Sequence, residues 1–228
     1  MINSDQQNKL NELCTIFLEE NSKLNLSAFR TQENCFIGNI MDCVAVVDAP
    51  EFKKIMEGES IKILDIGTGG GFPLLPLAIL YPNSKLIGLD SVQKKVDAVK
   101  RITEKLSLSN VDVISGRTEE LGRDENHREK YDIVTARALA PLNTLLEYAS
   151  AFVAPNGLVI AWKSLNIDKE IKDSLMARAE LSCQLEKSFE YNLGEKWGKR
   201  QLLIFRKRAP LNKKYPREVG IPKKKPLI

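Results

Sequence analysis

The 228-residue sequence predicts an α/β fold: a mostly parallel sheet that ends in an antiparallel hairpin and carries an N-terminal helical cap. Three observations lead to this prediction. Short apolar runs alternate with stretches of helical periodicity through the middle of the chain, which is typical of a parallel sheet. The run 61–66 leads into the glycine-dense turn 67–71, and the next run ends in Asp90. The last two runs have no helix between them, which indicates a hairpin.

The segment 1–57 precedes the first strand and is expected to form the helical cap. Apolar residues recur at helical spacing from Leu10 to Leu18, which predicts a helix over 5–20. A similar apolar stripe predicts a second helix over 33–47. Both helices would lie on the sheet through their apolar faces.

The Rossmann-like core is expected over 58–206, and the basic segment 207–228 follows it as a tail, all within one methyltransferase-like domain. A parallel sheet finished by an antiparallel strand is the arrangement of class I methyltransferases. We predict strands over 61–66, 85–89, 111–114, 131–135 and 157–162, helices over 73–80, 92–106, 141–153 and 167–180, and a hairpin over 181–191 and 201–206.

The glycine turn has the form expected where a cofactor approaches the backbone. Gly67 and Gly69 permit positive φ, and the helix that follows offers unpaired N–H groups to an anionic group. The spacing G-x-G-x-G is typical of S-adenosylmethionine enzymes. Phe72 stands where a dinucleotide-binding pattern has its third glycine, and no P-loop lysine follows. Asp90 is predicted to accept hydrogen bonds from the cofactor ribose. The alternative is a turn that only joins strand to helix.

Charge is distributed unevenly along the chain. The formal net charge is +4, yet the last 23 residues carry nine Lys or Arg and one acid, so the rest of the chain is slightly acidic. A basic end on an acidic body indicates contact with a polyanion, although a solvated tail is the alternative. The four cysteines form no C-x-x-C pair, which predicts reduced thiols and no metal site. With no membrane-length apolar run and no signal-peptide pattern, we expect a soluble cytoplasmic protein.

Eight short motifs are spread over nearly the whole chain. They are Asn-Leu-Ser-Ala (25–28), Ile-Met-Asp (40–42), Asp-Ile-Gly-Thr-Gly-Gly-Gly-Phe-Pro (65–73), Leu-Asp-Ser (89–91), Arg-Thr-Glu-Glu (117–120), Thr-Ala-Arg-Ala (135–138), Lys-Tyr-Pro-Arg (214–217) and Pro-Lys-Lys-Lys-Pro (222–226). Together they resemble one family, the 16S ribosomal RNA guanine-N7 methyltransferases, RsmG or GidB. The family usually has a histidine before Ile-Leu-Asp, whereas Asn39 stands at that position here, so any RNA contact by that histidine would be made otherwise.

The resemblance implies methyl transfer from S-adenosylmethionine to N7 of a guanine in the 16S RNA of the small ribosomal subunit. It implies that the donor is held at Gly67, Phe72, Thr118, Glu119 and Arg137, beside the residues Gly69 and Asp90 taken from the glycine motif. Structural alternatives stay open for some of these residues. Glu119 could be the first acid of a helix, Arg137 a buried ion-pair partner, and Asp65 a brace of the turn.

The basic tail is expected to bind RNA and to leave cofactor affinity almost unchanged. Its candidate RNA contacts are Lys213, Lys214, Arg217, Lys223, Lys224 and Lys225.

Guanine N7 carries an in-plane lone pair, so no general base is expected in the site. Lys163, after the fifth predicted strand, could contact phosphate or base, and a surface lysine is the alternative. The chain lacks the Asn/Asp-Pro-Pro-aromatic motif that accepts an exocyclic amine. We expect a monomer. Two other functions compete, a nicotinamide-dependent oxidoreductase and a catalytically silent RNA-binding protein.

Overall fold

The computed structural model describes residues 2–228, in which seven strands form one sheet in the order β3-β2-β1-β4-β5-β7-β6. The pairs β2–β3, β1–β2, β1–β4 and β4–β5 are parallel, whereas β5–β7 and β6–β7 are antiparallel. The predicted fold class is therefore confirmed. The strands are β1 (Lys62–Ile66), β2 (Lys85–Asp90), β3 (Val111–Ser115), β4 (Tyr131–Arg137), β5 (Val153–Lys163), β6 (Cys183–Asn192) and β7 (Lys199–Lys207).

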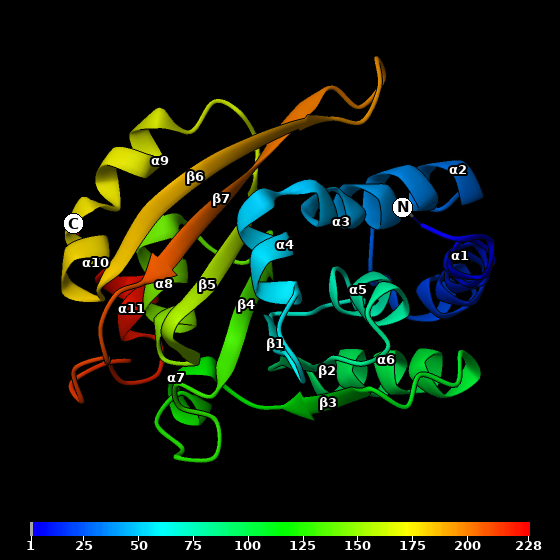
Figure 1. Ribbon diagram of the computed structural model, residues 1–228. Helices are drawn as coiled ribbons and strands as arrows, with labels where there is room; N and C mark the ends of the chain where they lie inside the picture. Colours follow the sequence, from blue (N-terminus) through cyan, green and yellow to red (C-terminus); the bar gives the residue numbers. More distant parts are fainter. Residues whose placement is uncertain (1) are drawn as a thin grey trace.

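Helices cover both faces of this sheet (Figure 1). Successive strand residues point to opposite faces, so Ile63 belongs to one apolar core and Leu64 to the other. Each fully buried large apolar side chain contributes about 1.5–3 kcal/mol. The helices are α1 (Ser4–Leu24), α2 (Gln32–Cys35), α3 (Asp42–Val44), α4 (Pro50–Met56), α5 (Leu74–Leu80), α6 (Gln93–Lys105), α7 (Thr118–Leu121), α8 (Leu142–Ser150), α9 (Asp168–Asp173), α10 (Leu175–Glu180) and α11 (Ile221–Lys224).

The N-terminal cap packs on the side of the sheet that α5 and α6 cover. Helix α1 begins at a capping box, in which the Asn3 side chain accepts from the Gln6 N–H, and it ends at Asn25 with φ of 52°. The predicted helix over 33–47 is interrupted. A π-helical turn, η1 (Phe36–Met41), and a 3₁₀ turn, η2 (Ala45–Asp48), flank the short α3. Residues of the π turn approach the end of β4.

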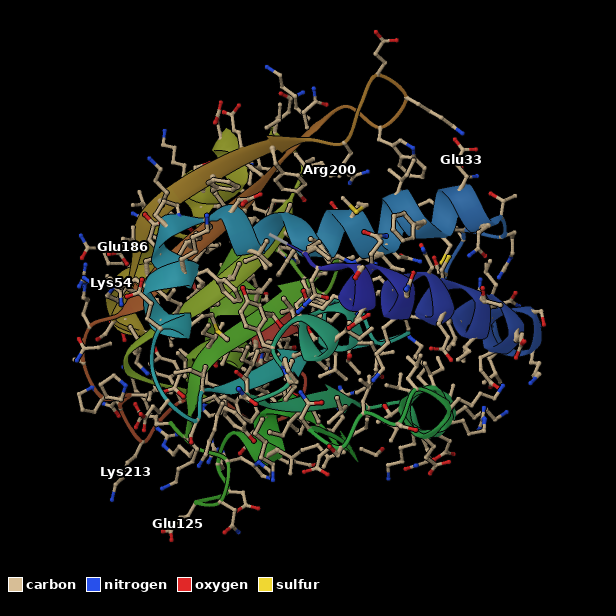
Figure 2. All side chains as sticks on the ribbon, turned by 45° about the vertical axis from the view of Figure 1, so that its right-hand side comes forward. Glu33, Lys54, Glu125, Glu186, Arg200 and Lys213 are labelled. Atoms are coloured by element: carbon tan, nitrogen blue, oxygen red, sulfur yellow. The ribbon has the colours of Figure 1, made fainter. Side chains whose placement is uncertain are left out.

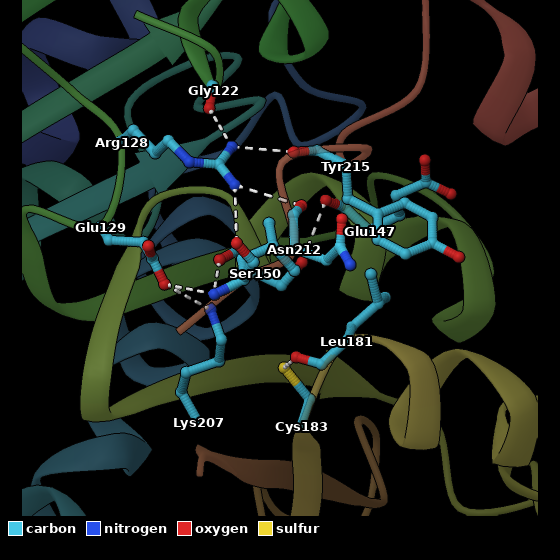
Figure 3. A network of polar contacts seen from close by, with 11 residues as sticks. Gly122, Arg128, Glu129, Glu147, Ser150, Leu181, Cys183, Lys207, Asn212 and Tyr215 are labelled. Atoms are coloured by element: carbon cyan, nitrogen blue, oxygen red, sulfur yellow. Dashed lines mark hydrogen bonds and ion pairs between the residues drawn. The ribbon is translucent and has the colours of Figure 1, made fainter. Parts of the chain in front are cut away.

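The C-terminal segment 207–228, which the sequence marked as the basic tail of the domain, is folded back onto the body. The guanidinium of Arg128 donates to the carbonyl oxygens of Leu211, Asn212 and Tyr215 at distances of 2.8–3.3 Å. Lys207 is fully buried and donates to Glu129 and to the Ser150 carbonyl (Figure 3). This network fixes the start of the segment beside α8. The segment then forms α11, and Figure 1 marks the C-terminus beside α10.

Two further kinds of difference from the sequence prediction concern short elements. The expected helix 167–180 is divided into α9 and α10 at Ser174, whose hydroxyl donates to the Ile171 carbonyl at 2.7 Å. A side chain that hydrogen-bonds to a backbone carbonyl of the preceding turn weakens helical continuity at that point. Helices α4, α7 and α11 were not predicted, because four to seven residues are too short to show a helical period.

Candidate active site

Two adjoining cavities lie at the carboxyl ends of the parallel strands, where ligands of such sheets bind. The first has a volume of about 650 Å³ and is lined by Asp90, Thr118 and Glu119; we call it the Glu119 cavity. The second has a volume of about 630 Å³ and is lined by Phe72 and Arg137; we call it the Arg137 cavity. A larger hollow of about 1120 Å³ lies at the opposite ends of the strands, and its size alone does not make it the site.

The boundary between the two cavities is formed by residues that line both. They are Gly67, Lys95 and Ala138. Ala138 follows β4 with φ of 53°, in the left-handed region that costs a non-glycine residue about 1–2 kcal/mol. Such strain is typical of ligand sites. The turn after β1 and the turn after β4 thus meet at one point of the sheet edge.

The glycine loop is braced by Asp90, the acid at the end of β2. Asp90 Oδ2 accepts from the Gly69 N–H at 2.9 Å, and Oδ1 accepts from the Val92 N–H at 2.9 Å. Gly69 has φ of 56°, and a Cβ there would find only the Gly67 carbonyl, 3.8 Å away. Gly69 therefore presents bare backbone to the Arg137 cavity. Asp90 keeps further lone pairs for ribose hydroxyls, so bracing the loop and holding a ligand are compatible.

Beneath this loop lies Asp65, the buried acid of β1. Its Oδ1 accepts from the Thr135 hydroxyl at 2.9 Å, and burial raises its pKa to about 6. Within residues 2–228, neither Asp65 Oδ2 nor the Thr68 hydroxyl has a hydrogen-bond partner. Asp65 lines neither cavity. Its bond to Thr135 braces the β1–β4 pair, whereas the sequence suggested a brace of the glycine turn.

The Glu119 cavity holds the two residues that the sequence placed after the third strand. Thr118 and Glu119 open α7, and Glu119 is 2% exposed. Glu119 Oε2 accepts from the Thr118 hydroxyl at 3.1 Å, and Oε1 accepts from the Gly220 N–H at 2.9 Å. Tyr148 also lines this cavity, and burial together with the nearby Glu119 carboxylate raises its pKa.

In the Arg137 cavity, the guanidinium at the end of β4 is held by the N-terminal cap. Arg137 Nη1 donates to the Gly38 carbonyl and to Asp42 Oδ2, both at 2.9 Å, and Nη2 donates to Asn39 Oδ1 at 2.7 Å. The guanidinium carbon lies 5.8 Å from the centre of the Phe72 ring. Arg137 is thus both a cavity residue and an ion-pair partner, two roles that the sequence prediction treated as alternatives.

Three further residues line this cavity, and the sequence motifs did not place them there. They are Asp42, Asn39 and Tyr191. Asp42 Oδ1 accepts from the Tyr191 hydroxyl at 2.6 Å. Asn39 is 1% exposed and contacts Arg137, so its side chain is committed inside the protein. The available signal was the Ile-Met-Asp motif, which contains Asp42 but does not show its partner.

Phe72 and Lys163 both line the Arg137 cavity. Phe72 packs edge-on against Phe17 of α1, with ring centres 4.8 Å apart. Lys163 Nζ pairs with Glu170 at 2.5 Å and donates to the Ala140 carbonyl at 3.0 Å. The ammonium group of Lys163 is therefore already paired inside the protein.

The six basic residues assigned to the tail divide into one partly buried arginine and five exposed lysines. Arg217 forms a bidentate ion pair with the buried Glu147, and the closest approach is 2.6 Å. Among the lysines, Lys214 pairs with Glu180 at 2.9 Å on the surface, and Lys223 lines the Glu119 cavity. The other three are Lys213, Lys224 and Lys225, and Figure 2 shows Lys213 pointing away from the body.

Within residues 2–228, no cluster of three or more His, Cys, Asp or Glu side chains could hold a metal ion. No helix in this part of the chain is long and apolar enough to span a membrane.

Solved structures with a similar fold include methyltransferases. The antibiotic-resistance methyltransferase Kmr has a TM-score of 0.52 and 18% identity, and the match covers 69% of this chain and 92% of that one. The 16S rRNA (adenine(1408)-N(1))-methyltransferase from Catenulisporales acidiphilia has a TM-score of 0.51 and 17% identity, and covers 72% of this chain and 94% of that one. At these identities the likeness concerns the fold alone.

Sequence relatives are much closer. Ribosomal RNA small subunit methyltransferase G of Caldanaerobacter subterraneus is 40% identical over 213 residues, which is 93% of this chain and 87% of the relative. The protein of the same name from Lactococcus lactis strain IL1403 is 34% identical over 212 residues, with coverage of 93% and 87%. The family described as GidB, rRNA small subunit methyltransferase G, matches residues 6–203. The chain therefore belongs to the GidB family of rRNA small subunit methyltransferase G proteins.

Proposed function

We propose that this protein transfers a methyl group from S-adenosylmethionine to N7 of a guanine in the 16S RNA of the small ribosomal subunit. The observation that carries the proposal is the pair of cavities that meet at Gly67 and Ala138, in a chain of this family. One cavity has room for the nucleoside half of the donor. The other has room for its amino-acid end and for the target base.

The residues present fit the donor. Asp90 and Glu119 are acceptors, which suit the ribose hydroxyls and the adenine amine. Gly69 leaves open backbone where the amino-acid end would approach, and Phe72 gives that end an apolar wall. Arg137 offers a planar set of N–H groups to a carboxylate or to a base. We assign cofactor binding to these five residues together with Gly67 and Thr118.

When bound, S-adenosylmethionine supplies an electrophilic methyl group on its sulfonium. The protein has to hold the guanine so that N7 lies about 3–3.5 Å from that carbon, and it has to exclude water. The N7 lone pair needs no deprotonation, so no side chain of the Arg137 cavity has to remove a proton. Arg137 and Phe72 would orient the reactants, and the paired Lys163 would act through position and not as a base.

RNA binding is assigned to the exposed lysines of the C-terminal segment. The exposed lysines of this segment supply salt-dependent affinity if they contact phosphates, and they are Lys213, Lys214, Lys223, Lys224 and Lys225. Arg217 is engaged by Glu147, so its expected contact with RNA requires that this pair open. Because one chain carries both cavities, we propose a monomer, acting in the cytoplasm where it would meet ribosomal RNA.

The test is a methylation assay on small ribosomal subunits from cells that lack this protein. The purified protein is incubated with isotopically labelled S-adenosylmethionine, and the 16S RNA is digested and analysed by mass spectrometry. We expect the label in 7-methylguanosine at a single position. Label in another nucleoside would overturn the assignment of N7, and cofactor binding without any transfer would favour the silent RNA-binding protein.

A further inference from the structure

Residues 216–226 of the C-terminal segment reach the cofactor cavity. The Gly220 N–H donates to Glu119 Oε1 at 2.9 Å, and Lys223 and Pro226 line the Glu119 cavity. The Pro222 carbonyl accepts from the buried Thr144 hydroxyl at 3.1 Å. Segment 216–226 therefore lines this cavity and contacts Glu119, one of the residues that we assign to adenosine.

This contact is built into the fold and is not a loose surface approach. Arg217 fixes the segment through a bidentate pair with Glu147, a residue with no exposed surface. Arg123 Nε donates to the Pro216 carbonyl at 3.0 Å, and Arg128 donates to the Tyr215 carbonyl at 2.8 Å (Figure 3). Buried charges that are paired and hydrogen-bonded hold one geometry, because leaving either partner unpaired is costly.

We propose that segment 216–226 is a wall of the cofactor site and that its Gly220 N–H positions Glu119 to accept a hydrogen bond from the adenine amine. The inference rests on the proposed function, since it presumes an adenosyl ligand. One Glu119 oxygen is held by Gly220 and the other by the Thr118 hydroxyl, which fixes the carboxylate plane. A carboxylate attracts an N–H donor and repels a carbonyl oxygen, so its placement selects adenine over a 6-oxo purine.

This role differs from the expectation that the segment serves RNA and leaves cofactor affinity unchanged. Removal of the Gly220 contact would release one oxygen of a buried carboxylate and open the cavity wall. Both changes act on the adenosine end of the ligand. Affinity and base discrimination are therefore expected to fall together.

Gly220→Pro tests the positioning role, and Gly194→Pro is its matched control. Both glycines have positive φ, 80° and 97°, and a Cβ at either would meet nothing within 4 Å. Each N–H donates to a side-chain oxygen, Glu119 for one and Asn192 for the other. Proline removes the N–H and forbids positive φ at both. Gly194 lies in the turn between β6 and β7, far from Glu119 in the sheet order.

Calorimetry on the full chain measures binding of S-adenosylhomocysteine and of its inosyl analogue, in which a carbonyl replaces the amine. We expect Gly220→Pro to weaken S-adenosylhomocysteine about tenfold or more and to reduce the preference over the inosyl analogue about fivefold or more, because a charged acceptor is misplaced. Gly194→Pro should leave both quantities at the wild-type values.

The outcomes separate this inference from the proposed function. Wild-type protein that binds no S-adenosylhomocysteine overturns the proposed function. Wild-type binding with unchanged affinity or unchanged preference in Gly220→Pro overturns the positioning of Glu119. If Gly220→Pro fails to fold, amide exchange in the wild type decides: bound S-adenosylhomocysteine should slow exchange in peptides covering 217–225 about tenfold or more. Equal exchange with and without ligand would overturn the proposal that segment 216–226 is a wall of the cofactor site.

Discussion

The two cavities share one edge of the sheet but are closed by opposite ends of the chain. The N-terminal cap closes the Arg137 cavity through side chains, chiefly the Arg137–Asp42 pair, whose members lie 95 residues apart in the sequence. The C-terminal segment closes the Glu119 cavity through a backbone N–H of Gly220, which is 101 residues from Glu119. Each half of the site therefore depends on a contact that exists only in the folded protein.

The difference lies in what each closing element does chemically. In the Arg137 cavity the charged groups line the ligand space and form ion pairs with one another. A substitution there changes the groups that orient the reactants. In the Glu119 cavity the main anchoring pair, Arg217–Glu147, lies behind the wall, with Glu147 fully buried and Arg217 partly buried, so a substitution there changes the stability of the wall. The two regions should therefore respond differently to mutation.

The largest expected effect is the loss of the buried pair behind the Glu119 cavity. Arg217→Met leaves the fully buried Glu147 carboxylate without its partner, which should lower the free energy of unfolding by about 3–5 kcal/mol. Lys214→Met is the control, because its pair with Glu180 is exposed and should contribute little to the free energy of unfolding. Urea unfolding measures both. Similar losses in the two variants would mean that Arg217 anchors nothing.

Asp65, beneath the boundary of the cavities, should make stability depend on pH. Burial raises its pKa to about 6 in the folded protein, above the ordinary value of 3.8. The folded state therefore holds the proton more tightly, and the stability from this group is lost as pH rises through about 4 to about 6, by up to roughly 3 kcal/mol. Asp65→Asn should gain stability relative to wild type over that window. A difference that is constant from pH 4 to pH 7 would contradict the raised pKa.

Turnover tests the Arg137 cavity. Arg137→Lys keeps the charge but loses the planar fork that reaches Gly38, Asp42 and Asn39 together. We expect methyl transfer to fall about tenfold or more, which corresponds to about 1.4 kcal/mol, with little change in the melting temperature of the free protein. Activity that merely follows unfolding would assign Arg137 to structure alone. Unchanged cofactor affinity with reduced turnover would assign it to base placement.

The smallest expected effect concerns RNA. Lys224→Gln with Lys225→Gln removes two exposed charges without touching the Arg217 anchor. The slope of log affinity against log salt should become shallower by about 1.4 if both lysines contact phosphates of single-stranded RNA. Filter binding to 16S RNA fragments measures the slope. An unchanged slope would show that these lysines are only solvated.

Sequence patterns predicted the sheet well because the strand signal is local. The predicted runs 61–66 and 85–89 match β1 and β2 within a residue, since each is a short apolar run that can be seen within its own segment. The antiparallel hairpin was predicted for the same reason, from two extended runs without a helix between them. The helix over 33–47 was predicted as continuous, because a π turn leaves no periodic mark.

The long-range partners could not be predicted from the sequence. Glu147 looks like any acid on a helix, and only the fold shows that it is fully buried against Arg217. By charge alone Arg217 and Lys213 are equivalent. In the structure Arg217 is paired with Glu147, whereas Lys213 is exposed. Gly220 gave no signal either, because its role is a backbone N–H that any residue but proline carries.

A crystal structure of the complex with S-adenosylhomocysteine tests most directly whether the two cavities form one site. We expect adenine beside Glu119 and segment 216–226, ribose hydroxyls within hydrogen-bond distance of Asp90, and the amino-acid end of the ligand in the Arg137 cavity. A ligand in the large hollow near Lys62, or one with its adenine away from Glu119, would contradict it.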